Sequence, residues 1–476
     1  MLFNSFQFFV FFPIVVLFYY LIPHKLRNLW LLVASYFFYM CWNVKYVLIL
    51  LFSTGITYGC GIMLEFLRAK AYQRKWQKYS MIFCIGANLA ILFVFKYFDF
   101  ALENLNRVLG IFHREPVSPL FALVLPVGIS FYIFQAIGYT IDVYRQEIPA
   151  ERNFLRYALF VSFFPQLVAG PIERSGNLMR QFREEHSFSY ERAKEGLALM
   201  LWGYFMKLVI ADRIAIFVNQ VYGNPQVFSG VYLIVATVLF AVQIYCDFAG
   251  YSTIAIGAAK VMGFELMENF DAPYLARSVT DFWRRWHISL TSWFRDYLYI
   301  PLGGNRKGKM RKYLNVLVVF LISGLWHGAS WTFVIWGGLN GFYQILEALT
   351  HHKIKSRLLT FLLVDFSWIF FRADHFSGAW SMIKSMLTVH NWTVLWDGSL
   401  YMAGLSQKNF VVLGIGIFVL FLADWLKEKK VCVREKIMQT YLPVRYVVWL
   451  TAIVGILVFG IWGPTYDAGA FIYFQF

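Results

Sequence analysis

Charged residues are scarce in this chain. They make up 15% of the sequence, against 59% hydrophobic and 20% aromatic residues. The apolar residues come in repeated runs of about 20, the length that crosses ~30 Å of hydrocarbon. No polar stretch is long enough to form a soluble domain of appreciable size. The composition therefore predicts an all-α polytopic membrane protein whose chemistry takes place in the membrane body.

Cysteines are also few. They are odd in number and scattered, mostly within apolar stretches, at Cys41, Cys60, Cys84, Cys246 and Cys432. This pattern favours free, buried thiols over a disulfide framework. The sequence has no tandem repeat, no low-complexity tract and no Gly-x-Ser-x-Gly nucleophile elbow. The missing elbow argues against a serine hydrolase.

Acidic residues are outnumbered, 27 against 43 Lys and Arg, which leaves a net charge of +16. Nucleic acid is not the predicted partner, because the basic residues cluster in short loops between apolar runs and do not line one surface. Such clustering is typical of the positive-inside rule. It places the loops 24–28, 66–78, 142–153 and 306–312 in the cytoplasm, and the N-terminus and residues 98–118 outside.

The apolar runs predict about 11–13 membrane helices, because some runs are too short to span. They lie at 7–22, 29–41, 46–63, 80–97, 119–141, 155–170, 196–218, 229–247, 252–264, 314–326, 331–349, 358–371, 409–424 and 445–462. The first run has no basic n-region and no small-residue cleavage site. We therefore expect a retained membrane helix there and not a signal peptide.

Three places predict re-entrant or broken helices: Gly170-Pro171, the short run 252–264 and the Gly- and Pro-bearing stretch 301–304. A membrane tolerates irregular backbone only where protein buries it or where a water-filled cavity solvates it. A central cavity is therefore expected. Segments 172–195 and 425–444 are mixed in charge and amphipathic, so we expect them on the membrane surface.

Two histidines sit in or against long apolar segments, at His287 and His327. Hydrocarbon offers an imidazole no hydrogen-bond partner, and an imidazole exchanges protons near neutrality, so both are functional candidates. Fifteen residues separate His327 from Lys312 of the basic loop. At about 1.5 Å per residue, a helix would place this imidazole roughly 22 Å from the cytoplasmic boundary. His287 precedes the same loop, and we expect the two rings to share one cavity.

The segments around these histidines carry a resemblance. Asp281-Phe282-Trp283-Arg284-Arg285-Trp286-His287-Ile288-Ser289-Leu290, paired with Gly324-Leu325-Trp326-His327-Gly328, resembles the signature of the membrane-bound O-acyltransferase (MBOAT) superfamily. The chain is similar to the bacterial branch that O-acetylates exported polysaccharides, typified by alginate and peptidoglycan O-acetyltransferase membrane subunits. The similarity extends to residues 3–5, 164–172, 368–373 and 471–476.

The resemblance implies a single integral-membrane domain over residues 1–476, with a catalytic core at about 119–350 around the cavity. His327 matches the catalytic histidine of the family, and His287 matches the partner position, where relatives carry His or Asn. Other polar residues of the region are predicted as supporting, substrate-binding positions: Asp247, Arg285, Arg295, Asp296 and Tyr297.

The implied activity is transfer of an acyl group, expected to be acetyl, from a cytoplasmic thioester donor such as acetyl-CoA. His327 would act as the general base, and His287 would orient the donor or stabilise the oxyanion. The resemblance further implies an extracytoplasmic SGNH-type transferase as partner and O-acetylation of an exported polysaccharide. We expect a multi-pass protein of the bacterial cytoplasmic (inner) membrane, surrounded by lipid, with no tightly bound cofactor.

Several alternatives remain open at this stage. The imidazoles can be structural, and Arg285 can form a salt-bridged collar with Asp281 and Arg284 at the cavity mouth. A metal site is disfavoured, because two histidines without a third ligand at suitable spacing make a poor zinc site. Two other functions compete: D-alanyl transfer from a carrier-protein thioester to teichoic acid, and a proton-coupled transporter.

Overall fold

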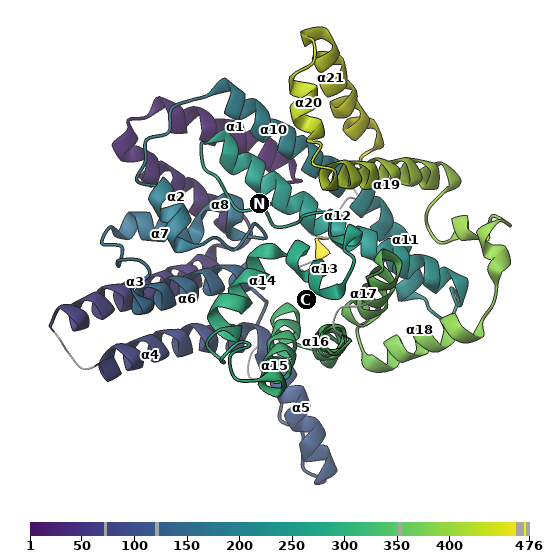
Figure 1. The fold of residues 1–476 in the computed structure, drawn as a ribbon, viewed down its shortest axis with the longest axis horizontal. Coiled ribbons are helices and arrows are strands. Elements are labelled where there is room, and N and C mark those ends of the chain that lie inside the picture. Colours follow the sequence, from purple (N-terminus) through teal and green to yellow (C-terminus); the bar gives the residue numbers. More distant parts are fainter. Residues whose placement is uncertain (71–73, 120–122, 351–354, 463–470, 473–476) are drawn as a thin grey trace. The chain divides into compact units, whose positions relative to one another are not determined.

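The computed structural model describes residues 1–70, 74–119, 123–350, 355–462 and 471–472, and all regular structure in these ranges is helical. The all-α prediction is confirmed. The chain divides into two compact units, Met1–Gly196 with Ala258–Met267, and Leu197–Gly257 with Glu268–Phe476. Figure 1 labels the helices and colours them in chain order, from purple to yellow.

The helices of the first unit are α1 (Phe6–Leu21), α2 (His24–Met40), η1 (Val44–Tyr46), α3 (Val47–Ala69), α4 (Arg74–Leu92), η2 (Phe93–Tyr97), α5 (Phe98–Ile111), α6 (Ile129–Arg145), α7 (Phe154–Ser162), α8 (Phe164–Leu167) and α9 (Ser175–Gln181). Two of the three boundaries between the units fall within further helices, α10 (Tyr190–Tyr204) and α12 (Val231–Val261), and the third lies between Met267 and Glu268.

The remaining helices belong to the second unit. They are η3 (Phe205–Ala211), α11 (Asp212–Gly223), η4 (Pro273–Leu275), α13 (Val279–Arg285), α14 (Ile288–Phe294), η5 (Arg295–Tyr299), α15 (Lys309–His327), α16 (Trp331–Leu349), α17 (Arg357–Arg372), α18 (Phe376–Thr388), η6 (Trp392–Leu395), η7 (Ser399–Met402), α19 (Gln407–Glu428), α20 (Val433–Met438) and α21 (Leu442–Phe459).

Five helical stretches are long and apolar enough to cross a membrane by length and composition, among the described residues: Val44–Ala69, Arg74–Ile111, Val231–Val261, Gln407–Glu428 and Leu442–Phe459. This number is below the 11–13 expected from the apolar runs. Many of the other helices are shorter, because turns interrupt apolar sequence that looks continuous. Others carry charged residues at one end. The predicted span at 155–170, for example, is divided into α7 and α8.

One predicted break is wrong. The run 252–264 was expected to be a separate re-entrant segment, but most of it is the C-terminal part of the 31-residue helix α12. The shortness of the apolar run suggested an interruption, yet the polar residues Asp247 and Ser252 are buried within the helix. A polar residue inside an apolar helix is stable when protein covers it, so the helix continues.

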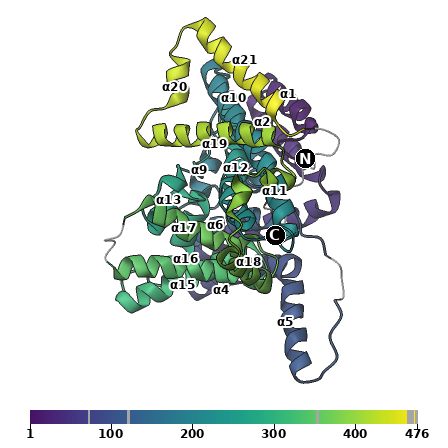
Figure 2. The same ribbon diagram turned by 90° about the vertical axis from the view of Figure 1, so that its right-hand side faces the viewer.

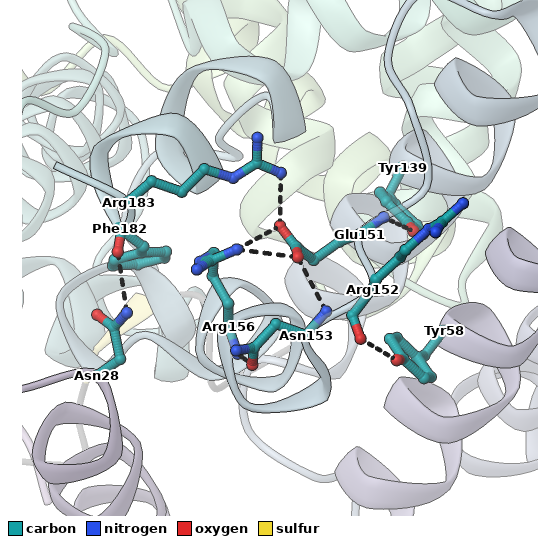
Figure 3. Close-up of polar contacts among 9 residues, drawn as sticks. All are labelled: Asn28, Tyr58, Tyr139, Glu151, Arg152, Asn153, Arg156, Phe182 and Arg183. Carbon is teal, nitrogen blue, oxygen red and sulfur yellow. Dashed lines mark hydrogen bonds and ion pairs between the residues drawn. The ribbon is translucent and has the colours of Figure 1, made fainter. Parts of the chain in front are cut away.

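The first unit contains a buried carboxylate, Glu151, whose side chain is 4% exposed. Figure 3 shows how it is held: Arg156 donates to both carboxylate oxygens (3.0 and 3.2 Å), Arg183 donates at 2.7 Å, and the Asn153 N–H donates at 2.9 Å. Burial raises the pKa of Glu151, but the hydrogen bonds from Arg183, Asn153 and Arg156 outweigh it and hold this pKa below its usual value. The loop before α7 is thus anchored as an ionised network.

In the second unit, α15 and α16 form a tightly packed helical hairpin, which Figure 2 shows side by side. Glycines make the close approach possible. A Cβ added at Gly324 would meet the backbone oxygen of Phe333, and one added at Gly337 would meet the backbone oxygen of Phe320. Small residues allow helix backbones to approach closely in membrane proteins. This contact positions the last residue of α15, which is His327.

We predict that Gly337→Ala destabilises the protein, because the new methyl group has to displace the α15 backbone. Overpacking of this kind costs about 1–3 kcal/mol. The neighbouring Gly338→Ala is the matched control, since its Cβ would only meet Leu321 Cδ2 at 3.6 Å while alanine favours the helix. Thermal unfolding in detergent should show a lower Tm for Gly337→Ala alone; equal Tm values would contradict the packing account.

Candidate functional site

His327 ends α15 and is 4% exposed. Its Nδ1 lies 2.7 Å from the carbonyl oxygen of Ser323, one helical turn earlier. A carbonyl oxygen only accepts, so Nδ1–H is the donor in this bond, and in the neutral ring Nε2 carries the lone pair. The helix backbone thereby selects the tautomer in which Nε2 is the basic nitrogen.

Aromatic rings surround the His327 imidazole. Ring centroids lie 4.8 Å away for Trp336, 5.0 Å for Trp326 and 5.7 Å for Phe371, all in near-perpendicular arrangements. Trp368 stacks on Trp336 at 5.7 Å and continues this wall. Apolar walls exclude water, which strengthens electrostatic interactions inside the site. Such surroundings favour proton transfer at a fixed nitrogen atom of the His327 ring.

His287 lies between two short helices, α13 and α14, and is fully buried. Its backbone adopts φ 44°, in the left-handed region that non-glycine residues rarely occupy. This residue lies outside the five candidate membrane-spanning stretches. Burial, with a smaller contribution from neighbouring His327, holds the pKa of His287 well below its usual value. The neutral imidazole is therefore favoured.

A side-chain amide contacts His287. The Oδ1 atom of Asn269 lies 3.2 Å from His287 Nδ1, and it also accepts hydrogen bonds from the N–H of Ser289 (3.2 Å) and from its hydroxyl (2.9 Å). The backbone carbonyl oxygen of Asn269 accepts a hydrogen bond from the N–H of Ile288 at 2.9 Å. One asparagine therefore contacts both the ring and the backbone beside it.

The two imidazoles lie together, with ring centroids 6.4 Å apart and planes at 81°. The expectation that these residues, forty positions apart in the sequence, meet in the fold is confirmed, while their shared role stays a prediction. Phe248 of α12 packs edge-on against His287 at 4.6 Å. The helix assumed between Lys312 and His327 is also present, because both belong to α15.

Asp247 belongs to a buried ionic cluster. Its Oδ1 lies 2.7 Å from Lys207 Nζ, and Lys207 also pairs with Asp212 at 2.7 Å. The second oxygen of Asp247 accepts the N–H of Ile472 at 2.8 Å. These contacts tie α12 to η3, α11 and the chain end. They assign Asp247 a structural task, while the expected substrate contact stays a prediction.

The other supporting residues form local contacts. Arg285 pairs with Asp281 at 3.0 Å, which is one of the contacts of the collar alternative. Arg295 pairs with Asp296 at 2.8 Å and is 64% exposed. Tyr297 packs against Trp293, with ring centroids 5.0 Å apart. The structure brings together the two histidines, and it places Arg295 and Asp296 in an ion pair of their own.

Comparisons with known proteins agree with this arrangement. The profile of the membrane-bound O-acyltransferase family, MBOAT, matches residues 144–371. The chain is 39% identical over 440 residues to a protein named probable alginate O-acetylase from Pseudomonas putida, covering 90% of this chain and 89% of that protein. The chain belongs to the membrane-bound O-acyltransferase family.

Two further relatives of the family are informative. The peptidoglycan O-acetyltransferase of Helicobacter pylori is 37% identical over 81% of this chain and 80% of its own length. The teichoic acid D-alanyltransferase of Bacillus subtilis is 26% identical over 56% of this chain and 68% of its own length. The protein is thus a multi-pass membrane enzyme, an O-acyltransferase, and the transporter alternative loses its support.

Several residues of this acyltransferase site were missed in the sequence. Asn269 is one of many polar residues between 243 and 341, and nothing in the local sequence sets Trp336 or Phe371 apart from other aromatic residues. Lys207 offered a signal, because a lone lysine inside the apolar run 196–218 has to be partnered or functional. The other three could not be found without the tertiary contacts that bring them to the histidines.

We predict that Lys207→Met strongly destabilises this acyltransferase. Removing the cation leaves Asp212 and Asp247 buried side by side without their shared partner, a loss that costs about 3–5 kcal/mol for buried ion pairs. Lys384→Met, on the exposed face of α18, is the control. Thermal unfolding of the two purified variants should show a large fall in Tm only for Lys207→Met. An unchanged Tm there would refute the structural assignment of the cluster.

Proposed function

We propose that this enzyme transfers an acetyl group from a cytoplasmic thioester, acetyl-CoA, for O-acetylation of an exported polysaccharide. The observation that carries the proposal is the His327 imidazole, buried among aromatic rings with Nδ1–H bonded to Ser323 and Nε2 left as the base. The printed names of the relatives that match most of the chain, an alginate O-acetylase and a peptidoglycan O-acetyltransferase, support acetyl as the group.

In the proposed step, His327 Nε2 takes the proton of the acceptor hydroxyl while its oxygen attacks the thioester carbonyl. The carbon–oxygen bond forms and the carbon–sulfur bond breaks. The thiolate of coenzyme A leaves with the electron pair and receives the proton from His327. The products are an acetyl ester and free coenzyme A, so the imidazole returns to its starting state. General-base assistance of this kind contributes about 10²–10⁴-fold.

His287 is proposed to orient the reactants beside His327. Its ring lies 6.4 Å from that of His327 between centroids, close enough for one small group to contact both. Its low pKa favours the neutral ring, whose Nδ1–H is engaged with Asn269. This state favours an orienting role over charge stabilisation by an imidazolium. Oxyanion stabilisation would then come from other donors or from the helix environment.

The direction of transfer and the partner are part of the same proposal. We place the enzyme in the bacterial cytoplasmic membrane with the donor on the cytoplasmic side. The basic segment 306–312 ends in the first turn of α15, which begins at Lys309, and its positive charge suits a donor that carries phosphates. The acceptor hydroxyl is proposed to belong to an extracytoplasmic SGNH-type transferase, which passes the acetyl group to the polysaccharide.

We predict that His327→Ala abolishes turnover because the base is lost, with a fall in kcat of at least about 10²-fold. The measurement is release of coenzyme A and transfer of label from radiolabelled acetyl-CoA by purified protein with an acceptor present. His390→Ala, at an exposed position after α18, is the matched control and should keep wild-type turnover. Wild-type turnover in a folded His327→Ala variant would contradict the assignment of His327 as the base.

D-alanyl transfer is the second candidate function, since the chain is also similar to a teichoic acid D-alanyltransferase. Its identity to this relative is lower, and the match covers less of the chain than the matches to the O-acetylating relatives do. We predict that purified protein turns over acetyl-CoA and leaves a D-alanyl carrier-protein thioester intact. The comparison needs equal donor concentrations and the His327→Ala protein as the blank. Selective use of the D-alanyl thioester would reverse the choice between the two functions.

A further inference from the structure

Three hydrogen-bond contacts converge on one atom, the Oδ1 of Asn269. The backbone N–H and the hydroxyl of Ser289 reach it at 3.2 and 2.9 Å, and Nδ1 of His287 lies at 3.2 Å. Asn269 is 1% exposed, and within the described residues its Nδ2 has no hydrogen-bond partner. Within the described residues, the side-chain amide of Asn269 therefore makes its hydrogen bonds through its oxygen atom.

The direction of these bonds follows from elementary chemistry. A backbone N–H can only donate, so the amide atom facing Ser289 has to be the oxygen, which fixes the orientation of the Asn269 side chain. An amide oxygen can only accept, so the contact with His287 requires a proton on Nδ1. In the neutral ring, Nε2 is then a hydrogen-bond acceptor.

Asn269 also holds the backbone at this position. Its carbonyl oxygen accepts the N–H of Ile288, the residue after His287, at 2.9 Å. The left-handed conformation of His287, with φ 44°, is unfavourable for a residue with a Cβ and persists only when its surroundings enforce it. Side-chain and main-chain contacts of one residue thus determine where the His287 ring lies and which tautomer it adopts.

We infer that Asn269 is a positioning residue for the acyl-transfer reaction, which holds His287 with Nδ1–H donating and Nε2 turned into an acceptor. The inference rests on the proposed function and deepens it. In this state Nε2 of His287 can accept a hydrogen bond and cannot donate one to an oxyanion, while the proton of the incoming hydroxyl goes to His327. Both histidines then adopt the tautomer with the proton on Nδ1. At His327 a helix carbonyl selects it, and at His287 an asparagine selects it.

The test compares Asn269→Asp with Asn269→Leu. Aspartate keeps the accepting oxygens and, since Asn269 Nδ2 makes no bond within the described residues, loses none. Its negative charge raises the pKa of His287, so the charged ring persists to higher pH. We expect the acid limb of the kcat profile to move up by about one pH unit or more. Leucine removes the acceptor, and we expect kcat to fall at least about 10-fold with a much smaller change in the donor KM.

The matched control is Asn315→Asp, another buried asparagine of the same unit, whose amide donates to the Gly304 carbonyl at 2.9 Å. It lies twelve residues before His327 on α15 and should leave the acid limb in place. An acid limb unchanged in Asn269→Asp, or a wild-type kcat in folded Asn269→Leu, would overturn the inference. If the leucine variant does not fold, the pH profile of the aspartate variant decides.

The same assay separates this inference from the proposed function. Inactive His327→Ala together with wild-type behaviour of both Asn269 variants would reject only the positioning role. Active His327→Ala would reject the proposed base itself, whatever the Asn269 variants do. A shifted acid limb in Asn269→Asp, absent in Asn315→Asp, together with inactive His327→Ala, is the result that supports both.

Discussion

A buried polar group in this chain is stabilised by a hydrogen-bond or charge partner within the protein, because the apolar surroundings offer none. This constraint explains the buried polar contacts in both units. Glu151 is held by two arginines and a backbone N–H, and Lys207 is shared by two aspartates. The same constraint acts on the histidines, where it determines the protonated nitrogen as well as the position of the ring.

The two imidazoles are held in different ways, and the difference matters for chemistry. His327 is bonded to the carbonyl one turn earlier in its own helix, so its orientation depends on α15 and on the glycine contacts that bring α16 close. His287 sits on a left-handed backbone position between two short helices. Its orientation depends on Asn269, eighteen residues earlier in the chain. A regular helix supports the base, and a loop supports its neighbour.

Much of this arrangement could be predicted. The apolar runs predict helices and the paired motifs around His287 and His327 predict an acyltransferase of this family, and both predictions are confirmed. The two rings also lie close together, while their roles in a shared site stay a prediction. The prediction of a separate segment at 252–264 was wrong, because Ser252 and its neighbours are buried and helix α12 continues through them. Hydropathy reports the composition of a segment and not what packs against it, so the continuity of α12 could not be read from the run itself.

The sequence alone determined the helical class, the membrane setting and the choice of His287 and His327 as candidate residues. Each of these depends on local composition or on residues adjacent in the chain. Only the tertiary structure decided that Asp247 pairs with Lys207, that Asn269 holds His287, and that Trp336 and Phe371 line His327. These contacts join residues that are not neighbours in the chain. The hydrogen-bonding geometry that selects the tautomer of His287 therefore exists only after these segments have packed.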